Sequence, residues 1–222
     1  MAKKTTEENI EHKEQLTKTE SFIDQNKKLI IIGAAAVVVI ILGFVGYKKL
    51  VSEPHEIESK DAYWNAFYDF ENDSLNTAAN GTATYPGMSE VADDYNGTSG
   101  GDIANYSMGI ISMEKGDFET ALDYFDNCDF EDVMLGTIVL GLKGDCYVEM
   151  GEFETAADYF EKAANREQNQ FTTPLYLKKA GLTYESLEQN ENAVTAYEKI
   201  KADWPESTEA RDIEKYIVRA QN

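Results

Sequence analysis

The sequence has 222 residues and is strongly acidic, with 20 lysines and arginines against 41 aspartates and glutamates. Residues 51–222 hold 12 of the basic and 35 of the acidic side chains, so the excess of negative charge lies almost wholly there. Such a segment repels the phosphates of nucleic acids and the surfaces of anionic membranes. Nucleic-acid binding is therefore excluded, and 172 residues are enough to bury a hydrophobic core.

The N-terminal part of the chain reads as a membrane anchor. Residues 1–28 are polar and charged and are predicted to form a cytoplasmic tail. Residues 29–45, LIIIGAAAVVVIILGFV, are all apolar or glycine, and as a helix they rise about 25 Å, close to the roughly 30 Å hydrocarbon core of a bilayer. A cleaved signal peptide fits less well, because the run begins late and has no small-residue cleavage site. We predict one transmembrane helix over residues 29–49.

The orientation of this helix follows from the lysines that flank it. Four lysines lie in the twenty residues before the span and three lie soon after it, which slightly favours a cytoplasmic N-terminus. The acidic C-terminal segment is then expected across the membrane, which is the periplasm with an inner-membrane anchor if the source is a Gram-negative bacterium.

One face of the span carries small residues at helical spacing. They could let a neighbouring helix approach closely, although glycine is common in spans and ordinary composition explains the stripe equally well. The residues of this predicted helix-packing face are Gly33, Ala36, Ile40, Gly43 and Tyr47.

After the span, residues 50–56 are predicted to be a linker in which Pro54 ends any helix that leaves the membrane. Residues 57–101 read as a degenerate leading repeat. Ala62, Trp64, Phe67 and Phe70 have helical spacing, and two further short helices are expected, over 73–80 with a cap at Gly81 and over 88–95.

A repeat dominates the remaining sequence. GDFETALDYF at 116–125 and GEFETAADYF at 151–160 agree at eight of ten positions, 35 residues apart. Three units share a spacing in which a glycine precedes an alanine by twelve residues and an aromatic follows that alanine by four. The residues are Gly109, Ala121 and Phe125, then Gly144, Ala156 and Phe160, then Gly181, Ala193 and Tyr197. This pattern predicts three tandem helical hairpins over 102–206, with a terminal capping helix over 207–222.

The spacing resembles the tetratricopeptide repeat. EKGDFETA and EMGEFETA are similar to that family's turn into its second helix, and Trp204-Pro205 stands where its closing proline usually occurs. The first two units lack the proline, and the third turn, SLEQNENA, lacks a glycine. The resemblance implies a tetratricopeptide-repeat α-solenoid, so the predicted fold is all-α, with the single N-terminal transmembrane helix followed by this solenoid.

The layout resembles a narrower family as well. A charged tail with the phrase TESFIDQNKK, one span and a repeat domain are similar to the YfgM-like ancillary subunits of the bacterial Sec translocon. VADDYNGTSGGDIANY, FTTPLYLKKAGLTYE and YEKIKADWPESTEARDIEKYI resemble the version found in Bacteroidetes. This resemblance implies two partners, the SecYEG translocon and a PpiD-like membrane-anchored prolyl isomerase, and a role in handing over emerging secretory proteins.

The sequence offers little for catalysis. Its two histidines, His12 and His55, fall in the tail and the linker, where no packed pocket is expected to hold a nucleophile and its base. No glycine-rich phosphate loop is present. We expect no enzymatic activity, no cofactor and no small-molecule substrate.

Two other groups of residues have side chains that could form a site. Cys128 and Cys146 could form a disulfide in an exported domain, but two buried free thiols are the more usual outcome. An acidic run lacks the spacing of a calcium loop and reads as solvated surface, so no metal is expected. The run consists of Asp123, Asp126, Asp129, Glu131 and Asp132.

The remaining candidate is a surface for protein binding. In stacked hairpins the first helices line a concave face, and an apolar stripe within an acidic surround suits an extended or helical segment of a partner. Core packing, or cover by the flanking helices, would give a similar pattern. The predicted groove residues are Ile103, Tyr106, Ile110, Met113, Ile138, Gly141, Asp145, Val148, Leu175, Lys178, Leu182 and Glu185.

The combined hypothesis is a membrane-anchored periplasmic interaction module, acting as an accessory of the Sec translocon. The alternatives are a scaffold in cell-envelope biogenesis, which the missing lipobox cysteine disfavours, and a membrane-anchored signalling adaptor with a cytoplasmic repeat domain.

Overall fold

The computed structural model describes the backbone of residues 2–222 and the side chains of residues 22, 23 and 25–222. It divides into two compact units, Met1–Pro54 and His55–Asn222, which are described separately. The residues described contain helices and no β-strand, apart from one isolated bridge between Gly81 and Pro86. The all-α prediction is confirmed.

The first unit is one long helix, α1 (Ala2–Tyr47), followed by a short π-helix, η1 (Lys48–Ser52). In the described part of the chain, one helical run, Gln25–Glu71, is long and apolar enough to cross a membrane, with a mean hydropathy of 3.0 in its most apolar window and none of that window buried. The predicted packing face stays a prediction: its five residues are all exposed, and no atom lies within 4 Å of a Cβ built on Gly33 or Gly43.

The predicted break at the end of the span is wrong. Residues 50–56 are helical, because η1 runs directly into α2 (Glu53–Glu71), where Pro54 is the second residue. Glu53 donates its N–H to the carbonyl of Lys48, five residues back, so the hydrogen-bond ladder has already changed register when it reaches the proline. A proline has no N–H to donate and its ring crowds the carbonyl of the preceding turn, so the five-residue hydrogen bonds of the π-helix just before Pro54 are where the continuous helix accommodates it.

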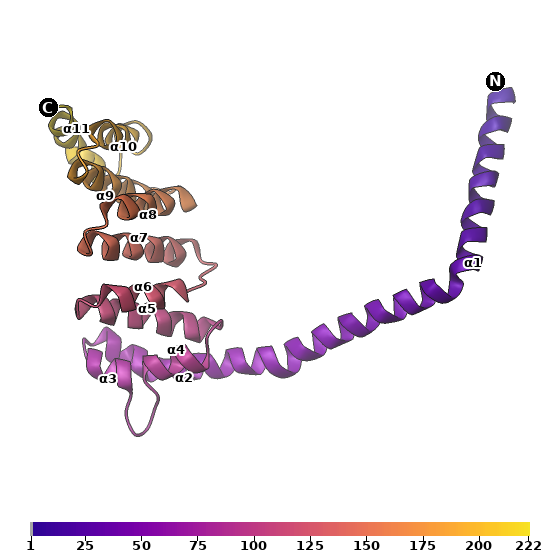
Figure 1. Cartoon of the computed structure of the whole chain (residues 1–222), viewed down its shortest axis with the longest axis horizontal. Coiled ribbons are helices and arrows are strands. Elements are labelled where there is room, and N and C mark those ends of the chain that lie inside the picture. Colours follow the sequence, from indigo (N-terminus) through magenta and orange to yellow (C-terminus); the bar gives the residue numbers. More distant parts are fainter. Residues whose placement is uncertain (1) are drawn as a thin grey trace. The chain divides into compact units, whose positions relative to one another are not determined.

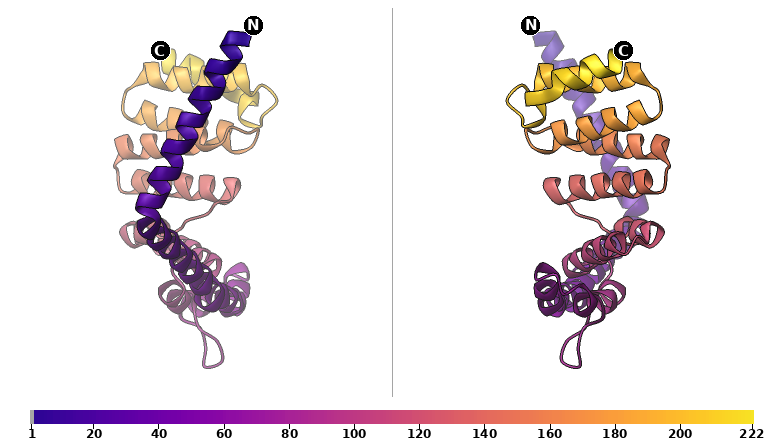
Figure 2. Two further views of the ribbon diagram at one scale, coloured as in Figure 1. Left: turned by 90° about the vertical axis from the view of Figure 1, so that its right-hand side faces the viewer. Right: turned by 90° about the vertical axis from the view of Figure 1, so that its left-hand side faces the viewer.

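The second unit begins with three helices that share one core. α2, α3 (Leu75–Asn80) and α4 (Met88–Asp94) pack with α5 (Ser99–Glu114) around buried residues that include Ala66, Met88 and Val91. The helices expected over 73–80 and 88–95 are confirmed, and α3 ends at Gly81 with a φ of 70°. The loop between α3 and α4 extends away from the helices in Figures 1 and 2.

Three hairpins follow, as Figure 1 shows. The first pairs α5 with α6 (Phe118–Asp126), the second pairs α7 (Val133–Glu149) with α8 (Phe153–Arg166), and the third pairs α9 (Thr172–Ser186) with α10 (Asn190–Asp203). Each first helix packs against its own second helix, and the second helix then packs against the first helix of the next hairpin.

The repeated glycine and aromatic form the central contact of each hairpin. A Cβ on Gly144 would lie 2.6 Å from Cε1 of Phe160, and the ring of Phe160 is only 2 % exposed. The same contact joins Gly109 to Phe125 and Gly181 to Tyr197, at 2.4 and 2.3 Å. Glycine is needed here because the ring occupies the space that any side chain would fill. The predicted packing role of these residues is confirmed.

The turns inside the hairpins use one left-handed residue each. Gly116 and Gly151 have φ values of 75° and 78°, and the third hairpin has Glu188 at the equivalent position with a φ of 58°. The missing glycine of the third turn therefore leaves a glutamate in a conformation that costs L-residues about 1–2 kcal/mol.

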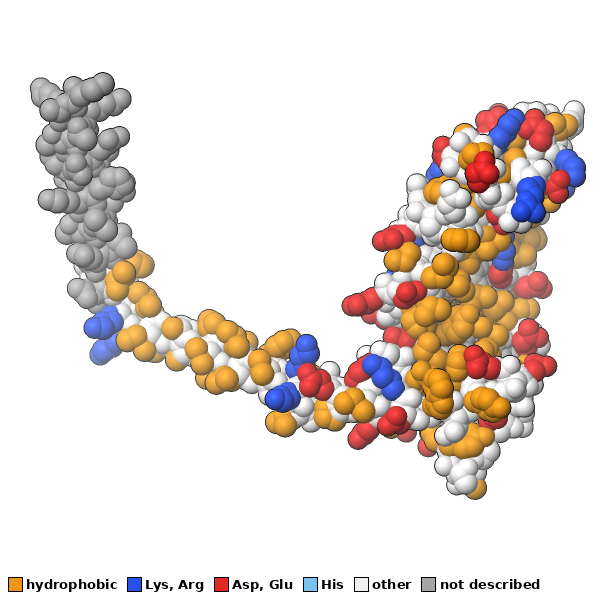
Figure 3. All heavy atoms as spheres, turned by 180° about the vertical axis from the view of Figure 1, so that it is seen from behind, with side chains coloured by type: hydrophobic (Ala, Val, Ile, Leu, Met, Phe, Trp, Pro, Cys, Tyr) orange, Lys and Arg blue, Asp and Glu red, His pale blue; other side chains and the backbone are white. Residues whose placement is uncertain are grey.

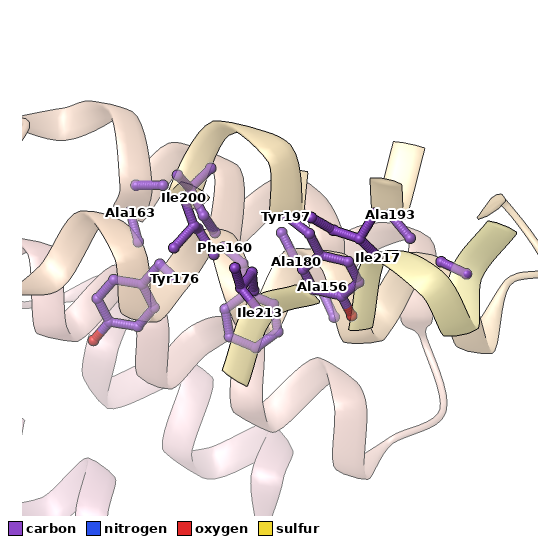
Figure 4. Close-up of a cluster of buried hydrophobic side chains, with 13 residues drawn as sticks. Ala156, Phe160, Ala163, Tyr176, Ala180, Ala193, Tyr197, Ile200, Ile213 and Ile217 are labelled. Atoms are coloured by element: carbon purple, nitrogen blue, oxygen red, sulfur yellow. The ribbon is translucent and has the colours of Figure 1, made fainter. Parts of the chain in front are cut away.

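The chain ends in a short 3-10 helix, η2 (Glu209–Asp212), and α11 (Ile213–Gln221). α11 packs on α10 and buries Ile213, Ile217 and Ala220 against the largest hydrophobic cluster among the described residues. Figure 4 shows this cluster, in which the rings of Phe160, Tyr176 and Tyr197 lie among the side chains of α8 to α11. The last hairpin thereby keeps its apolar face out of water.

Candidate partner-binding surface

The predicted groove residues all lie on the first helices of the hairpins, α5, α7 and α9. Leu175 and Leu182 are exposed, at 37 % and 39 %, and Gly141 is buried. The other nine are partly exposed: Ile103, Tyr106, Ile110, Met113, Ile138, Asp145, Val148, Lys178 and Glu185.

Gly141 does not belong to an open surface. A Cβ at this position would lie 2.0 Å from Cε1 of Tyr176, so the tyrosine ring covers the glycine. The contact brings α7 and α9 together, and burial raises the pKa of Tyr176 to about 12. Beside it, Lys179 donates to both carboxylate oxygens of Asp145 at 2.7 Å, which joins the same two helices.

The terminal helix engages two other predicted groove residues. Nζ of Lys178 lies 4.5 Å from the centre of the Tyr216 ring, and Glu185 accepts two hydrogen bonds of 2.7 Å from Arg219. Tyr197 also donates to Glu185, at 2.6 Å. Burial alone would raise the pKa of Glu185, but the hydrogen bonds from Arg219 and Tyr197 outweigh it and lower that pKa. These contacts hold α11 in place. Lys178 and Glu185 therefore already have partners within the protein and are less available to a binding partner.

Packing also uses part of the apolar face. Tyr106, Ile110 and Met113 lie against the small core between the first and second hairpins, and Val148 lies against the larger core. Of the predicted apolar residues, Ile103, Ile138, Leu175 and Leu182 lie outside these core clusters.

The structure adds two residues that the sequence reasoning missed. Met134 is 43 % exposed and Phe171 is 76 % exposed, and they stand four residues before Ile138 and Leu175. A spacing of four residues places Met134 and Ile138 on one face of α7, so that spacing was the available signal there, whereas Phe171 stands just before the first residue of α9. Figure 3 shows one face of the repeat domain on which hydrophobic side chains gather between acidic ones.

Comparison with known families bears on this surface. Two family models, both described as the tetratricopeptide repeat, match residues 139–170 and 178–207. This chain contains tetratricopeptide repeats. The matches fall on the second and third hairpins, and the first hairpin shares their glycine–aromatic contact. No curated protein and no solved structure shows a significant match.

Tetratricopeptide repeats are protein-interaction modules, and the chain is built accordingly. The exposed first helices form a surface that another protein can contact, carried on a chain that also has one helix long enough to cross a membrane. Among the residues described, no three metal-ligating side chains gather into a group that could hold an ion.

The remaining reactive side chains are committed to packing. Both cysteines are free thiols, and burial raises the pKa of Cys128 to about 12 and that of Cys146 to about 11. The expectation that His55 lies in an unpacked linker is wrong, because it belongs to α2 and its ring lies 4.9 Å from that of Tyr95. His12 lies outside the side chains that the structure describes.

Proposed function

We propose that this chain is a membrane-anchored adaptor that works beside the Sec translocon, with its repeat domain in the periplasm of a Gram-negative bacterium. The proposed partners are the SecYEG channel and a PpiD-like membrane-anchored prolyl isomerase that acts on secreted proteins. The observation that supports it best is the exposed apolar face of α7 and α9, where Met134, Phe171, Leu175 and Leu182 lie in contact with solvent.

The anchor and the charge agree with this role. α1 exposes an uninterrupted apolar surface from Leu29 to Val45, which suits a lipid environment. The strong negative charge of residues 51–222 repels anionic lipid and nucleic acid, so it restricts contacts to partners with complementary surfaces. The resemblance of the sequence layout to YfgM-like subunits is the reason for proposing the translocon as one of these partners.

Two experiments test the proposal. A reporter that is active only in the periplasm, fused after Asn222, is expected to be active, and a reporter active only in the cytoplasm is expected to be silent. The opposite pattern would favour a cytoplasmic signalling adaptor. Gentle solubilisation of membranes and purification of the chain is expected to recover a Sec channel subunit and an anchored prolyl isomerase. Their absence from such a preparation would refute the translocon role.

A further inference from the structure

Two adjoining concavities lie where α2, the start of α5 and the loop between α6 and α7 meet. One has a volume of about 540 Å³, the other of about 500 Å³, and both are lined by Ser99 and Ile103. They belong to the second unit, and their lining residues lie outside the two segments that the family models match.

The larger concavity is acidic. None of the described residues that line it is a lysine or an arginine. Five of them carry a carboxylate: Glu56, Asp102, Asp129, Glu131 and Asp132. Two of these carboxylates have structural duties, since Glu56 binds Ser99 and Lys60, and Asp132 caps the N-terminus of α7 through the N–H of Leu135. The other three have no cationic partner among the described side chains.

Asp102 is the most informative of the three. It is only 8 % exposed, and a single donor reaches its carboxylate, the N–H of Asp129 at 3.1 Å from Oδ1. Oδ2 accepts no hydrogen bond from the described residues. It is not among the side-chain atoms that are both unpaired and closed off from solvent, so solvent reaches it through the concavity that Asp102 lines. Burial first, and then the charges of Asp129 and Glu56, raise the pKa of Asp102. A buried carboxylate without a countercharge is costly, and a cation that enters the concavity would remove that cost.

The floor of the site is apolar. Ile103, Phe130 and Leu135 line the acidic concavity, and the aliphatic stem of a long basic side chain can lie on such a surface while its charged end reaches the carboxylates. In the neighbouring concavity, Tyr63 and Trp64 provide aromatic walls, and the Trp64 side chain is 64 % exposed. This wall suits a large apolar side chain next to the basic one.

We propose that this double concavity binds an extended segment of a partner protein that carries an arginine or lysine beside a large apolar residue. The basic side chain pairs with Asp102 and Asp129, and the apolar side chain packs on Trp64 and Ile103. The inference rests on the proposed function, because it names what one end of the binding surface recognises.

The test uses the full-length chain in nanodiscs of zwitterionic lipid and fluorescein-labelled peptides with the core Gly-Ser-Leu-Arg-Ser-Gly. Fluorescence anisotropy is expected to show at least tenfold tighter binding than for peptides with glutamine in place of arginine, because charge-assisted hydrogen bonds are lost with the charge. Replacing the leucine by glycine is expected to weaken binding several-fold.

Protein variants locate the effect. Asp102→Asn keeps an acceptor for the N–H of Asp129, and Asp129→Asn changes a side chain that is exposed and has no described partner, so both are expected to fold. Each should remove most of the preference for arginine, whereas Asp158→Asn, an equal change of charge at an exposed site of α8, should leave it within twofold.

Three results would overturn the inference: no measurable binding, equal binding of the arginine and glutamine peptides, or an equal loss in the Asp158→Asn control. The last would reveal only the general negative field of the domain. If the peptides fail to discriminate while Sec components still copurify with the chain, then the recognition site is refuted and the proposed function stands.

Discussion

Replacing Gly144 by alanine tests whether the glycine–aromatic contact holds the hairpins together. The added methyl would lie 2.6, 2.7 and 3.0 Å from three ring carbons of Phe160, a side chain that is only 2 % exposed and has no room to move away. Overpacking of this kind costs about 2 kcal/mol, and alanine returns about 1 kcal/mol through its higher helix propensity. The net expectation is a loss of about 1 kcal/mol in the free energy of unfolding.

Urea unfolding of the full-length chain in detergent micelles, followed by far-ultraviolet circular dichroism, measures this loss as a lower midpoint at an unchanged slope. A second variant removes the cause of the clash. Phe160→Leu shortens the side chain that meets residue 144, so Gly144→Ala should cost less in the Phe160→Leu background than in the natural one, by about 1 kcal/mol in a double-mutant cycle. Additive effects, or a more stable Gly144→Ala variant, would refute the argument.

Three further predictions concern the repeat domain. Glu188→Gly is expected to stabilise the protein by about 0.5–1 kcal/mol in the same urea assay, because it relieves a left-handed glutamate at some cost in chain entropy, and a destabilised variant would contradict this. Cys128 and Cys146, with pKa values raised to about 12 and about 11 by burial, should react with maleimide at pH 8 far more slowly in the folded protein than in urea, and equal rates would show that they are not buried. Tyr197→Phe removes the hydrogen bond to Glu185 and should cost about 1–2 kcal/mol. The pKa of Glu185 is lowered from 4.5. Its stabilising contribution is therefore present above pH 4.5 and disappears as the pH falls through the pKa of the folded state. Urea midpoints at pH 7 and pH 3 should show that the effect of Tyr197→Phe is smaller in acid.

The repeat could be predicted because packing imposes it residue by residue. Gly109 is needed because the ring of Phe125 covers it, and Ala121 and Phe125 are both fully buried. The same residue types therefore recur wherever the same contact is made. The long apolar helix could also be predicted, since a continuous apolar run of this length is typical of a helix that is long enough to cross a membrane.

The predictions from short stretches of sequence fail where contacts with the rest of the chain decide the conformation. Pro54 signals a helix break in isolation, but a short π-helix before it changes the hydrogen-bond register and lets the helix continue. The helical spacing of Trp64 with Phe67 did not show whether its side chain is covered; it is 64 % exposed, because α2 buries the face that carries Ala66 and Phe67. Spacing places residues on a face of a helix, but only the neighbours decide which face is covered.

The binding surface was partly predictable for the same reason. First-helix positions could be assigned from the repeat, but contacts across repeats, such as Tyr176 on Gly141 or Arg219 on Glu185, depend on side chains far apart in sequence. The acidic concavity was missed because the run from Asp123 to Asp132 reads as solvated surface. Only the fold brings Asp129, in the loop after α6, beside the buried Asp102 of α5.

The central claim is that the exposed face of the first helices contacts a partner at the membrane. A photo-crosslinking amino acid at Leu182, on α9, tests it directly, with the same residue at the exposed Glu154 of α8 as the control. We expect a cross-linked product at Leu182 that contains a Sec channel subunit or an anchored prolyl isomerase, and none at Glu154. The absence of a product at Leu182, or the same product from both positions, would contradict it.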